Sequence, residues 1–267
     1  MKRTPAVAGQ FYSDSSSGLA ENVRSYMETS VPREKAVGVL VPHAGLMYSG
    51  HVAGAVYSRI EFPRTFILIG PNHTGIGKDV SIMTSGEWEV PTGRLKVDRS
   101  LAKNILERSE GIEEDASAHT MEHSLEVQLP FILHYSSSVQ IVPILIKSYS
   151  LQACREVGEA AAAAIKDADY PVTIVASSDM SHYVSESVAR SKDKEAIDRI
   201  LALDPPGLYN TVIDNNISMC GFAPATAMLY ASLILQARKA VLVKYSTSGE
   251  ISGDYNHVVG YAGILII

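Results

Sequence analysis

Cysteine is scarce in this sequence of 267 residues, which holds only Cys154 and Cys220. Two cysteines cannot form a disulfide framework, so we interpret both as free thiols of a reducing compartment. The N-terminal segment MKRTPAVAGQFYSDSSS has no apolar stretch behind its two basic residues and does not resemble a signal peptide. The longest apolar run, VVGYAGILII, is about half as long as a membrane span requires. We therefore expect a cytoplasmic protein that does not enter the membrane.

Positive charge is also in short supply. Lysine and arginine total 23 against 29 aspartates and glutamates, a net charge of −6. This balance argues against a broad basic surface, so we expect no nucleic acid and no anionic membrane as partners. Hydrophobic residues make up 46% of the chain and charged residues 19%, a composition that excludes a disordered chain.

Short apolar runs alternate with segments of helical character along the chain. The runs are rich in β-branched residues and almost continuous, which is typical of strands covered on both faces of a sheet. The predicted strands are AVGVLVP (36–42), TFILIG (65–70), VQIVPILI (139–146), PVTIVASS (171–178) and KAVLVKYS (239–246).

The segments between these strands predict helices. They run from Ser49 to Ile60, Leu101 to Arg108, Leu151 to Lys166, Ser187 to Leu203 and Ala223 to Arg238. This alternation predicts an α/β fold with a central, mainly parallel sheet flanked by helices.

The rest of the pattern predicts a mixed sheet in one domain. Residues 80–98 contain Gly and Pro turns between short strands, which indicates a hairpin at the sheet edge. The closing VVGYAGILII is predicted to be a further strand, and SDSSSG (13–18) a short polar connector. No linker and no repeat divides the chain, so we predict a single domain over residues 1–267.

Three of the eight histidines closely follow predicted strands. VGVLVPHAG places His43 after the first, FILIGPNH places His73 after the second, and TIVASSDMSH places His182 after the fourth. Ligands of α/β proteins bind where the carboxyl ends of strands converge. A single loop histidine is usually structural, but three in equivalent positions favour a functional site. Neutral imidazole is both the commonest metal ligand and the usual acid or base near pH 7, so both uses stay open.

Two further candidates lie near these histidines. Cys220 precedes a predicted helix, where a thiol pKa is lowered and the thiolate can bind a metal; alternatively it is a small buried hydrophobe. Asp179 lies three positions before His182 and can orient its ring or share its proton, although an aspartate at this place can also cap a turn.

The segment HTMEHSLEVQLPF (119–131) contains two histidines and two glutamates. We predict a helix that starts at Thr120 and is kinked or ended by Pro130. Its spacing is not the HExxH pattern of zinc proteases. His123 is a candidate pocket residue, whereas His119 is expected at the surface. We expect structural roles for His51, His134 and His257.

Several motifs, in order, resemble those of the Memo family. They are VPHAGLMYSG, GPNHTG, EWEVPTG, EHSLEVQLPF, SSDMSHY, MCGFAP and the closing GYAG, and the likeness extends over nearly the whole chain. That family includes the B component of the AmmeMemoRadiSam group and the mediator of ErbB2-driven cell motility. It is similar in structure to the LigB-type class III extradiol dioxygenases, which hold non-haem iron between two histidines and a carboxylate.

The resemblance implies roles for individual residues. His43 and His73 match the two ligand histidines, and Cys220 matches the third ligand position of Memo proteins. His182 matches the acid/base histidine of the dioxygenases, with Asp179 beside it, and His123 belongs to the Memo-specific EHS motif and would line the pocket. A cysteine thus stands where the dioxygenases have a carboxylate, and the softer sulfur shifts the preference toward copper or zinc.

Two functions of different kinds follow. The first is a mononuclear, metal-dependent redox or dioxygenase-like enzyme with an unidentified substrate, in which iron or copper is expected ahead of zinc. The second is a non-enzymatic binding or adaptor module, whose pocket at the strand ends takes a small molecule or a peptide. Metal-assisted hydrolysis is a third, weaker option.

Overall fold

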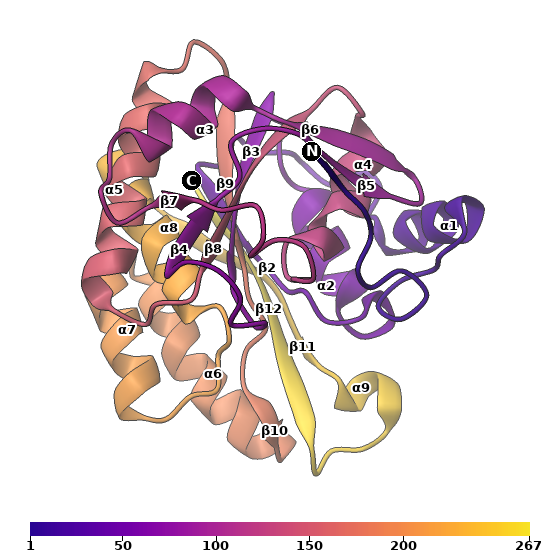
Figure 1. Ribbon diagram of the computed structural model, residues 1–267. Helices are drawn as coiled ribbons and strands as arrows, with labels where there is room; N and C mark the ends of the chain where they lie inside the picture. Colours follow the sequence, from indigo (N-terminus) through magenta and orange to yellow (C-terminus); the bar gives the residue numbers. More distant parts are fainter.

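A computed structural model describes residues 1–267. The fold is built around one mixed sheet of twelve strands (Figure 1). The strands are β1 (Lys2–Arg3), β2 (Gly38–Val41), β3 (Thr65–Pro71), β4 (Val80–Ile82), β5 (Glu87–Val90), β6 (Gly93–Val97), β7 (Glu113–Glu114), β8 (Gln140–Ile146), β9 (Val172–Ser177), β10 (His182–Val184), β11 (Ala240–Thr247) and β12 (Val258–Ile266).

The centre of the sheet is parallel, and its antiparallel pairs lie toward the margins. Strands run in the order β1-β5-β6-β8-β3-β9-β2-β12-β10, with β11 beside β12 and the pair β4 and β7 beside β8. The neighbours β8, β3, β9 and β2 are parallel, whereas β12 is antiparallel to β2 and β11. The prediction of an α/β fold with a mainly parallel, mixed sheet is therefore confirmed. The hairpin predicted within 80–98 forms from β5 and β6, and β6 adds to β8.

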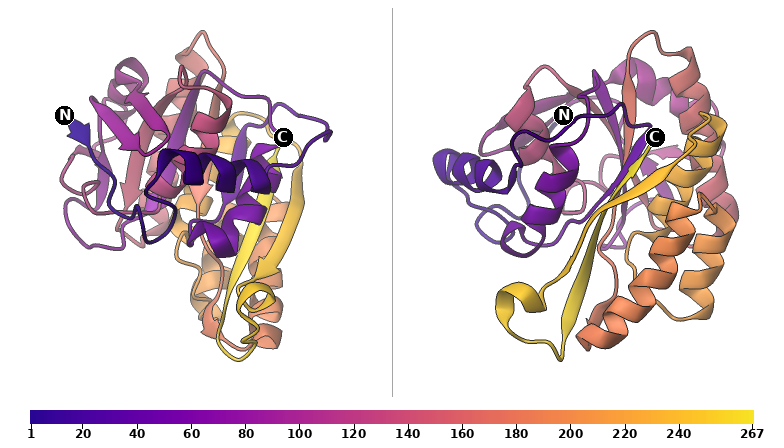
Figure 2. Two further views of the ribbon diagram at one scale, coloured as in Figure 1. Left: turned by 90° about the vertical axis from the view of Figure 1, so that its right-hand side faces the viewer. Right: turned by 180° about the vertical axis from the view of Figure 1, so that it is seen from behind.

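Helices cover both faces of this sheet. One face carries α3 (Arg99–Leu106), α5 (Leu151–Asp167), α6 (Glu186–Leu201), α7 (Pro205–Asp214) and α8 (Phe222–Ile234), and the other carries α1 (Ser16–Tyr26), α2 (Leu46–Tyr57) and α4 (Leu129–Tyr135) (Figure 2). A 3₁₀ turn, η1 (Glu126–Gln128), precedes α4, and α9 (Gly249–Ser252) lies between β11 and β12. None of the helices combines the length and the hydropathy that a membrane crossing requires.

The core explains the apolar runs. Every residue of β2 and β3 is buried, as predicted for strands with helices on both sides. The run at 239–246 is an exception, because β11 is mostly half-buried and pairs only with β12. Its partial exposure reflects a position at the margin of the sheet, where α2 and α6 contact the strand and cover its two faces only in part.

Three local expectations are also wrong. The polar stretch at 13–18 is not a connector: the Ser15 hydroxyl accepts a hydrogen bond from the Gly18 amide and starts α1 at Ser16. Helix α2 begins before Ser49, after Gly45. Pro130 lies in the first turn of α4 rather than at the end of a helix, a place where its missing N–H leaves no bond unmade.

Candidate metal centre

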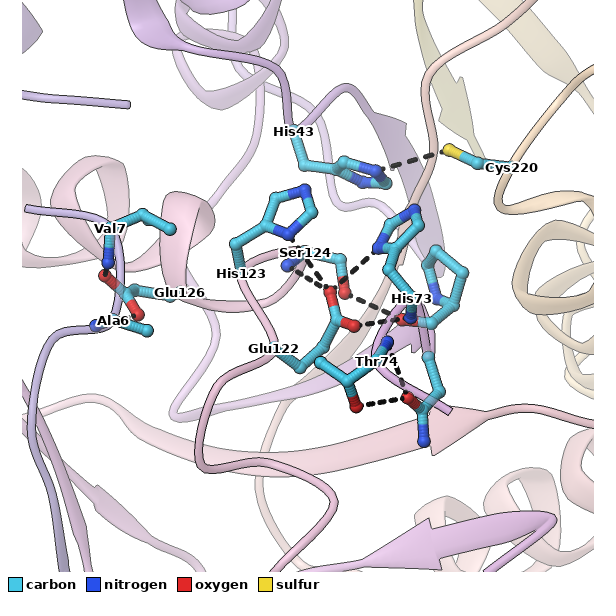
Figure 3. Close-up of polar contacts among 12 residues, drawn as sticks. Ala6, Val7, His43, His73, Thr74, Glu122, His123, Ser124, Glu126 and Cys220 are labelled. Carbon is cyan, nitrogen blue, oxygen red and sulfur yellow. Dashed lines mark hydrogen bonds and ion pairs between the residues drawn. The ribbon is translucent and has the colours of Figure 1, made fainter. Parts of the chain in front are cut away.

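The carboxyl ends of β2, β3 and β9 open into one cavity of about 600 Å³. His43, His73, His123, Asp179 and His182 all lie in its wall. Two predicted histidines and the candidate pocket residue His123 thus meet, and Figure 3 shows their rings facing one another from three separate segments. One potential donor atom from each of His43, His73 and His123 lies within 4.8 Å of the other two.

His43 is fixed with one nitrogen free for a ligand. Its ring is buried, and Nδ1 lies 2.9 Å from Ser177 Oγ. The Ser177 hydroxyl donates its own proton to the Ser124 carbonyl at 2.7 Å, so it accepts from His43 Nδ1. The proton is therefore on Nδ1, and Nε2 keeps its lone pair. Burial, together with the neighbouring histidines, lowers the pKa of His43 well below its usual range, which keeps the ring neutral.

A glutamine supports this arrangement from behind. The side-chain amide of Gln128 donates to the Pro42 carbonyl at 3.0 Å and to Ser177 Oγ at 2.9 Å. Its Oε1 accepts from the Tyr57 hydroxyl at 3.1 Å. A flipped amide would place its oxygen against the Pro42 carbonyl, so only one orientation satisfies all of these bonds.

His73 is oriented by a buried carboxylate. Its Nδ1 lies 2.9 Å from Glu122 Oε1, and its backbone N–H donates to Glu122 Oε2. Burial by itself raises the pKa of Glu122, but the hydrogen bonds and charge of His73 and the Ser124 amide outweigh it and hold the pKa at about 2. Glu122 is therefore ionised, accepts the Nδ1 proton of His73 and leaves Nε2 free, as in carboxylate–histidine pairs behind metal ligands.

His123 completes the trio. Its Nδ1 lies 3.4 Å from the same Glu122 oxygen, and its ring stacks on that of His73 with centroids 4.7 Å apart. Burial lowers the pKa of His123 and favours the neutral ring. Three imidazoles around one point fit a transition metal, because imidazole is a donor type which zinc, copper, iron and nickel accept.

The segment that carries His123 is an irregular loop held by the N-terminal arm. The predicted helix from Thr120 does not form, and regular structure begins only at Glu126. The buried Arg3 guanidinium donates to the carbonyls of His119 at 2.9 Å and Glu122 at 2.7 Å, and pairs with the Glu126 carboxylate. These bonds replace the helix, since they satisfy the backbone of a buried loop.

His119 is buried rather than exposed, which makes that expectation wrong. Its ring packs edge-on against Trp88, with centroids 5.7 Å apart, and neither ring nitrogen makes a hydrogen bond. Burial and the nearby Arg3 lower the pKa of His119 to about 4.

Cys220 lies at the Nε2 end of the His43 ring (Figure 3). Its Sγ is 3.3 Å from His43 Nε2 and accepts a hydrogen bond from the Asp179 amide at 3.3 Å. Gly221 makes this approach possible, because a Cβ there would lie 2.3 Å from the Ser177 carbonyl oxygen. Sγ lies outside the group formed by the three imidazoles. Cys220 as a metal ligand stays a prediction.

The expected lowering of the Cys220 pKa is wrong for the protein without a metal. Burial, followed by the charge of Asp179, raises the pKa of the thiol. The position before α8 does not compensate for the loss of water around the sulfur.

Asp179 and His182 share the cavity wall but have separate partners. Asp179 Oδ1 accepts from the backbone amides of His43 at 2.8 Å and Ala44 at 3.3 Å, so this carboxylate fixes the turn after β2. His182 Nδ1 lies 2.8 Å from the Ser218 carbonyl and donates its proton to it, which orients the ring. The ring is thus oriented by Ser218 rather than by Asp179.

Sequence reasoning did not assign the supporting residues. Glu122, Ser177, Gln128 and Arg3 received no role at the site, although Glu122 stands next to a candidate ligand in the chain. The position of Glu122 next to His123 was the one feature of the sequence that could have indicated its role. His257, expected to be structural, lies in the cavity wall.

Comparison with known proteins places the chain in a family. Residues 3–265 match the family of Memo-like proteins. A MEMO1 family protein of Methanothermobacter thermautotrophicus is 38% identical over 274 residues, covering 98% of this chain and 99% of that protein. One from Methanosarcina barkeri is 42% identical over 266 residues, covering 99% of both chains.

A solved structure also shares the fold. It is that of an uncharacterized protein from Escherichia coli K12, with a TM-score of 0.59 at 12% identity, covering 86% of this chain and all of that one. Given the match over nearly its whole length and the identities of these relatives, the chain belongs to the Memo-like family.

Proposed function

We propose that the chain is a mononuclear metal-dependent oxidoreductase whose ion is held by His43, His73 and His123 and whose substrate is an unidentified small molecule. The observation that carries this proposal is the convergence of three imidazoles on one cavity, two of them with their Nδ1 protons engaged behind the site. We propose iron or copper, because the resemblance implies redox chemistry. Such an ion would supply a Lewis acid and one-electron redox chemistry to a ligand in the cavity.

The chain's own residues would orient the ligand and move protons. His182 lies in the cavity wall with Nδ1 bonded to a carbonyl, so Nε2 is the nitrogen that would exchange a proton with a ligand bound beside the imidazoles. Asp179 holds the backbone of His43 and places a carboxylate in the same wall. We assign His182 the acid/base role and Asp179 a positioning role.

Cys220 is the candidate for an additional ligand. Metal–nitrogen and metal–sulfur bonds are about 2.0 and 2.3 Å long, so two such donors on one ion lie roughly 3–3.6 Å apart. The observed 3.3 Å between Cys220 Sγ and His43 Nε2 fits that range. Binding through sulfur would require the thiol to lose its proton, since burial raises its pKa.

Element analysis of purified variants tests the ligand set. His43→Ala, His73→Ala and His123→Ala are each expected to lose most of the metal bound by the parent. His182→Ala is the matched control, because it removes an imidazole from the same cavity but outside the trio, and should keep the metal. Cys220→Ser should weaken binding without abolishing it. Full metal content in His123→Ala, together with loss of metal in Cys220→Ser, would show that the third ligand is the Cys220 sulfur and not His123. Full metal content in His43→Ala would refute the site.

Glu122→Gln is expected to weaken metal binding by about 10–100-fold, because an outer carboxylate orients the ligand ring and raises its basicity. The dissociation constant is measured by competition with a chelator. Glu113→Gln, which removes a carboxylate from an exposed ion pair with Lys78, should leave the constant unchanged. Equal affinities in the two variants would show that Glu122 does not support the ligands.

A binding module on the same scaffold is the second candidate. It is favoured by Tyr183, a large aromatic side chain that is 76% exposed at the cavity. The two candidates differ in turnover: the enzyme consumes oxygen in the presence of metal and an aromatic diol, whereas the module does not.

A further inference from the structure

The cavity wall contains no lysine and no arginine. Sixteen residues line it; besides imidazoles and small side chains they include four aromatic residues and two carboxylates, namely Phe11, Tyr48, Tyr183, Tyr261, Asp179 and Asp254. Proteins bind phosphates and carboxylates mainly through arginine, lysine or free amides at a helix N-terminus. The first two are missing from this wall.

Several amides at the start of the nearest helix already have partners within the chain. Helix α2 starts at the cavity, but the amides of His43 and Ala44 before it donate to Asp179. The amide of Leu46 donates to the Phe11 carbonyl at 2.8 Å. The side chain of Asp179 thus occupies amides that an anionic ligand would need.

Four exposed apolar side chains belong to segments that line the cavity. Met47, Tyr183, Ile251 and Tyr255, here called the collar, are between 48% and 76% exposed. Tyr183 lines the cavity, and each of the other three is adjacent in the chain to a lining residue: Tyr48, Ser252 and Asp254. Apolar groups gathered around a polar cavity mark a surface that covers part of a ligand.

Tyr183 is held in a conformation that its residue type disfavours. Its φ is 57°, in the left-handed region, and the pairing of β10 with β12 shifts register between His182 and Val184. Such bulges redirect a side chain, and a bulky residue at positive φ is strained. Packing of the side chain does not compensate for this strain, because the ring is mostly exposed and contacts His182 edge-on, at a centroid distance of 5.9 Å. Strain of this kind gathers where ligands bind.

We propose that the cavity binds an uncharged ligand with an apolar or aromatic body, and that Tyr183 packs against this body at the mouth while a donor atom of the ligand faces the three imidazoles. Only the last clause rests on the proposed metal function. The wall offers neither lysine nor arginine to a phosphate or carboxylate group on the body, and the collar supplies apolar contact.

Three matched probes test the proposal: imidazole, N-phenylimidazole and the para-carboxylate of N-phenylimidazole. Their affinities are measured by calorimetry on the full chain, with and without added metal. The phenyl ring should raise affinity over imidazole about tenfold, the gain expected for covering part of an aromatic ring. The carboxylate should remove this gain. Equal affinities of the neutral and carboxylated probes would overturn the exclusion of anions.

Two variants test whether Tyr183 contacts the phenyl ring of the probe. Tyr183→Ala should lose most of the gain from the phenyl ring and leave the affinity for imidazole unchanged. Ile213→Ala, which truncates an exposed side chain on α7, should keep the gain. An unchanged gain in Tyr183→Ala would overturn the role of Tyr183. The affinity gained from the phenyl ring is expected in the metal-free protein as well. Metal-dependent binding of imidazole, by contrast, tests the proposed metal function alone. The two proposals can therefore be refuted independently of each other.

Tyr183→Gly tests whether the strain serves the ligand. Glycine adopts positive φ freely, so this variant should unfold about 2–4 °C above the parent while losing the phenyl gain as Tyr183→Ala does. A lower unfolding temperature would show that residue 183 is held for folding and would overturn the ligand role.

Discussion

Replacing Glu126 by glutamine is expected to lower the free energy of unfolding by about 3–5 kcal/mol, because it leaves the Arg3 charge buried without its partner. The two side chains are 0% and 1% exposed. The Glu126 carboxylate also accepts hydrogen bonds from the Tyr12 hydroxyl and from the amides of Ala6 at 2.8 Å and Val7 at 3.1 Å. Urea unfolding at pH 7 measures the change.

The matched control is Glu28→Gln. It breaks the ion pair between Glu28 and Arg59, whose side chains are 34% and 29% exposed. A pair that water reaches is worth about 0–1 kcal/mol, so this variant should unfold close to the parent. Similar losses of unfolding free energy in both variants would show that water reaches Arg3 and that the Arg3–Glu126 pair is not buried.

The Arg3–Glu126 pair also supports the loop of the candidate metal centre. Arg3 holds the carbonyl of Glu122, whose carboxylate orients His73 and whose neighbour is His123. Loss of Glu126 is therefore expected to loosen the loop that carries His123 as well as to destabilise the fold. Metal content of Glu126→Gln, measured at a temperature where the variant is folded, reports on this link.

Replacing His119 by leucine is expected to remove a pH dependence of stability worth about 2–3 kcal/mol at pH 4.5. The pKa of His119 is about 4 in the folded protein against an ordinary value of 6.5. Between these values the unfolded chain binds a proton that the folded protein does not. The histidine therefore contributes a loss of stability as the pH falls from about 6.5 to about 4, at roughly 1.4 kcal/mol per pH unit.

Urea unfolding of parent and His119→Leu at pH 7 and pH 4.5 measures this difference. At pH 7 the variant should be at least as stable as the parent, since neither ring nitrogen of His119 has a hydrogen-bond partner to lose. At pH 4.5 it should be the more stable by the amount stated. His257→Leu is the control, because its ring is 72% exposed and the same comparison should give little difference. A difference between parent and His119→Leu that does not grow on acidification would contradict the burial of a neutral His119.

Much of the fold could be predicted because its signals are local. A continuous apolar run such as TFILIG has to be covered on both faces, and the loops after parallel strands meet at one edge. His43 and His73 could therefore be brought together without coordinates. Helix α1 was not predicted, because its start depends on the single cap Ser15. This serine lies in a polar stretch whose composition is equally typical of a connector.

The sequence by itself determined the α/β layers, the family and the meeting of His43 with His73, since each follows from patterns within a few residues of the chain. Only the tertiary structure decided that His123 joins them, that His119 is buried and that the Cys220 thiol keeps its proton. The reason is that these three outcomes depend on partners far away in the chain. Arg3 holds the loop of His119 and His123 from more than a hundred residues away, and the burial that raises the pKa of Cys220 comes from segments packed around it. Desolvation and long-range hydrogen bonds leave no periodic trace in a sequence.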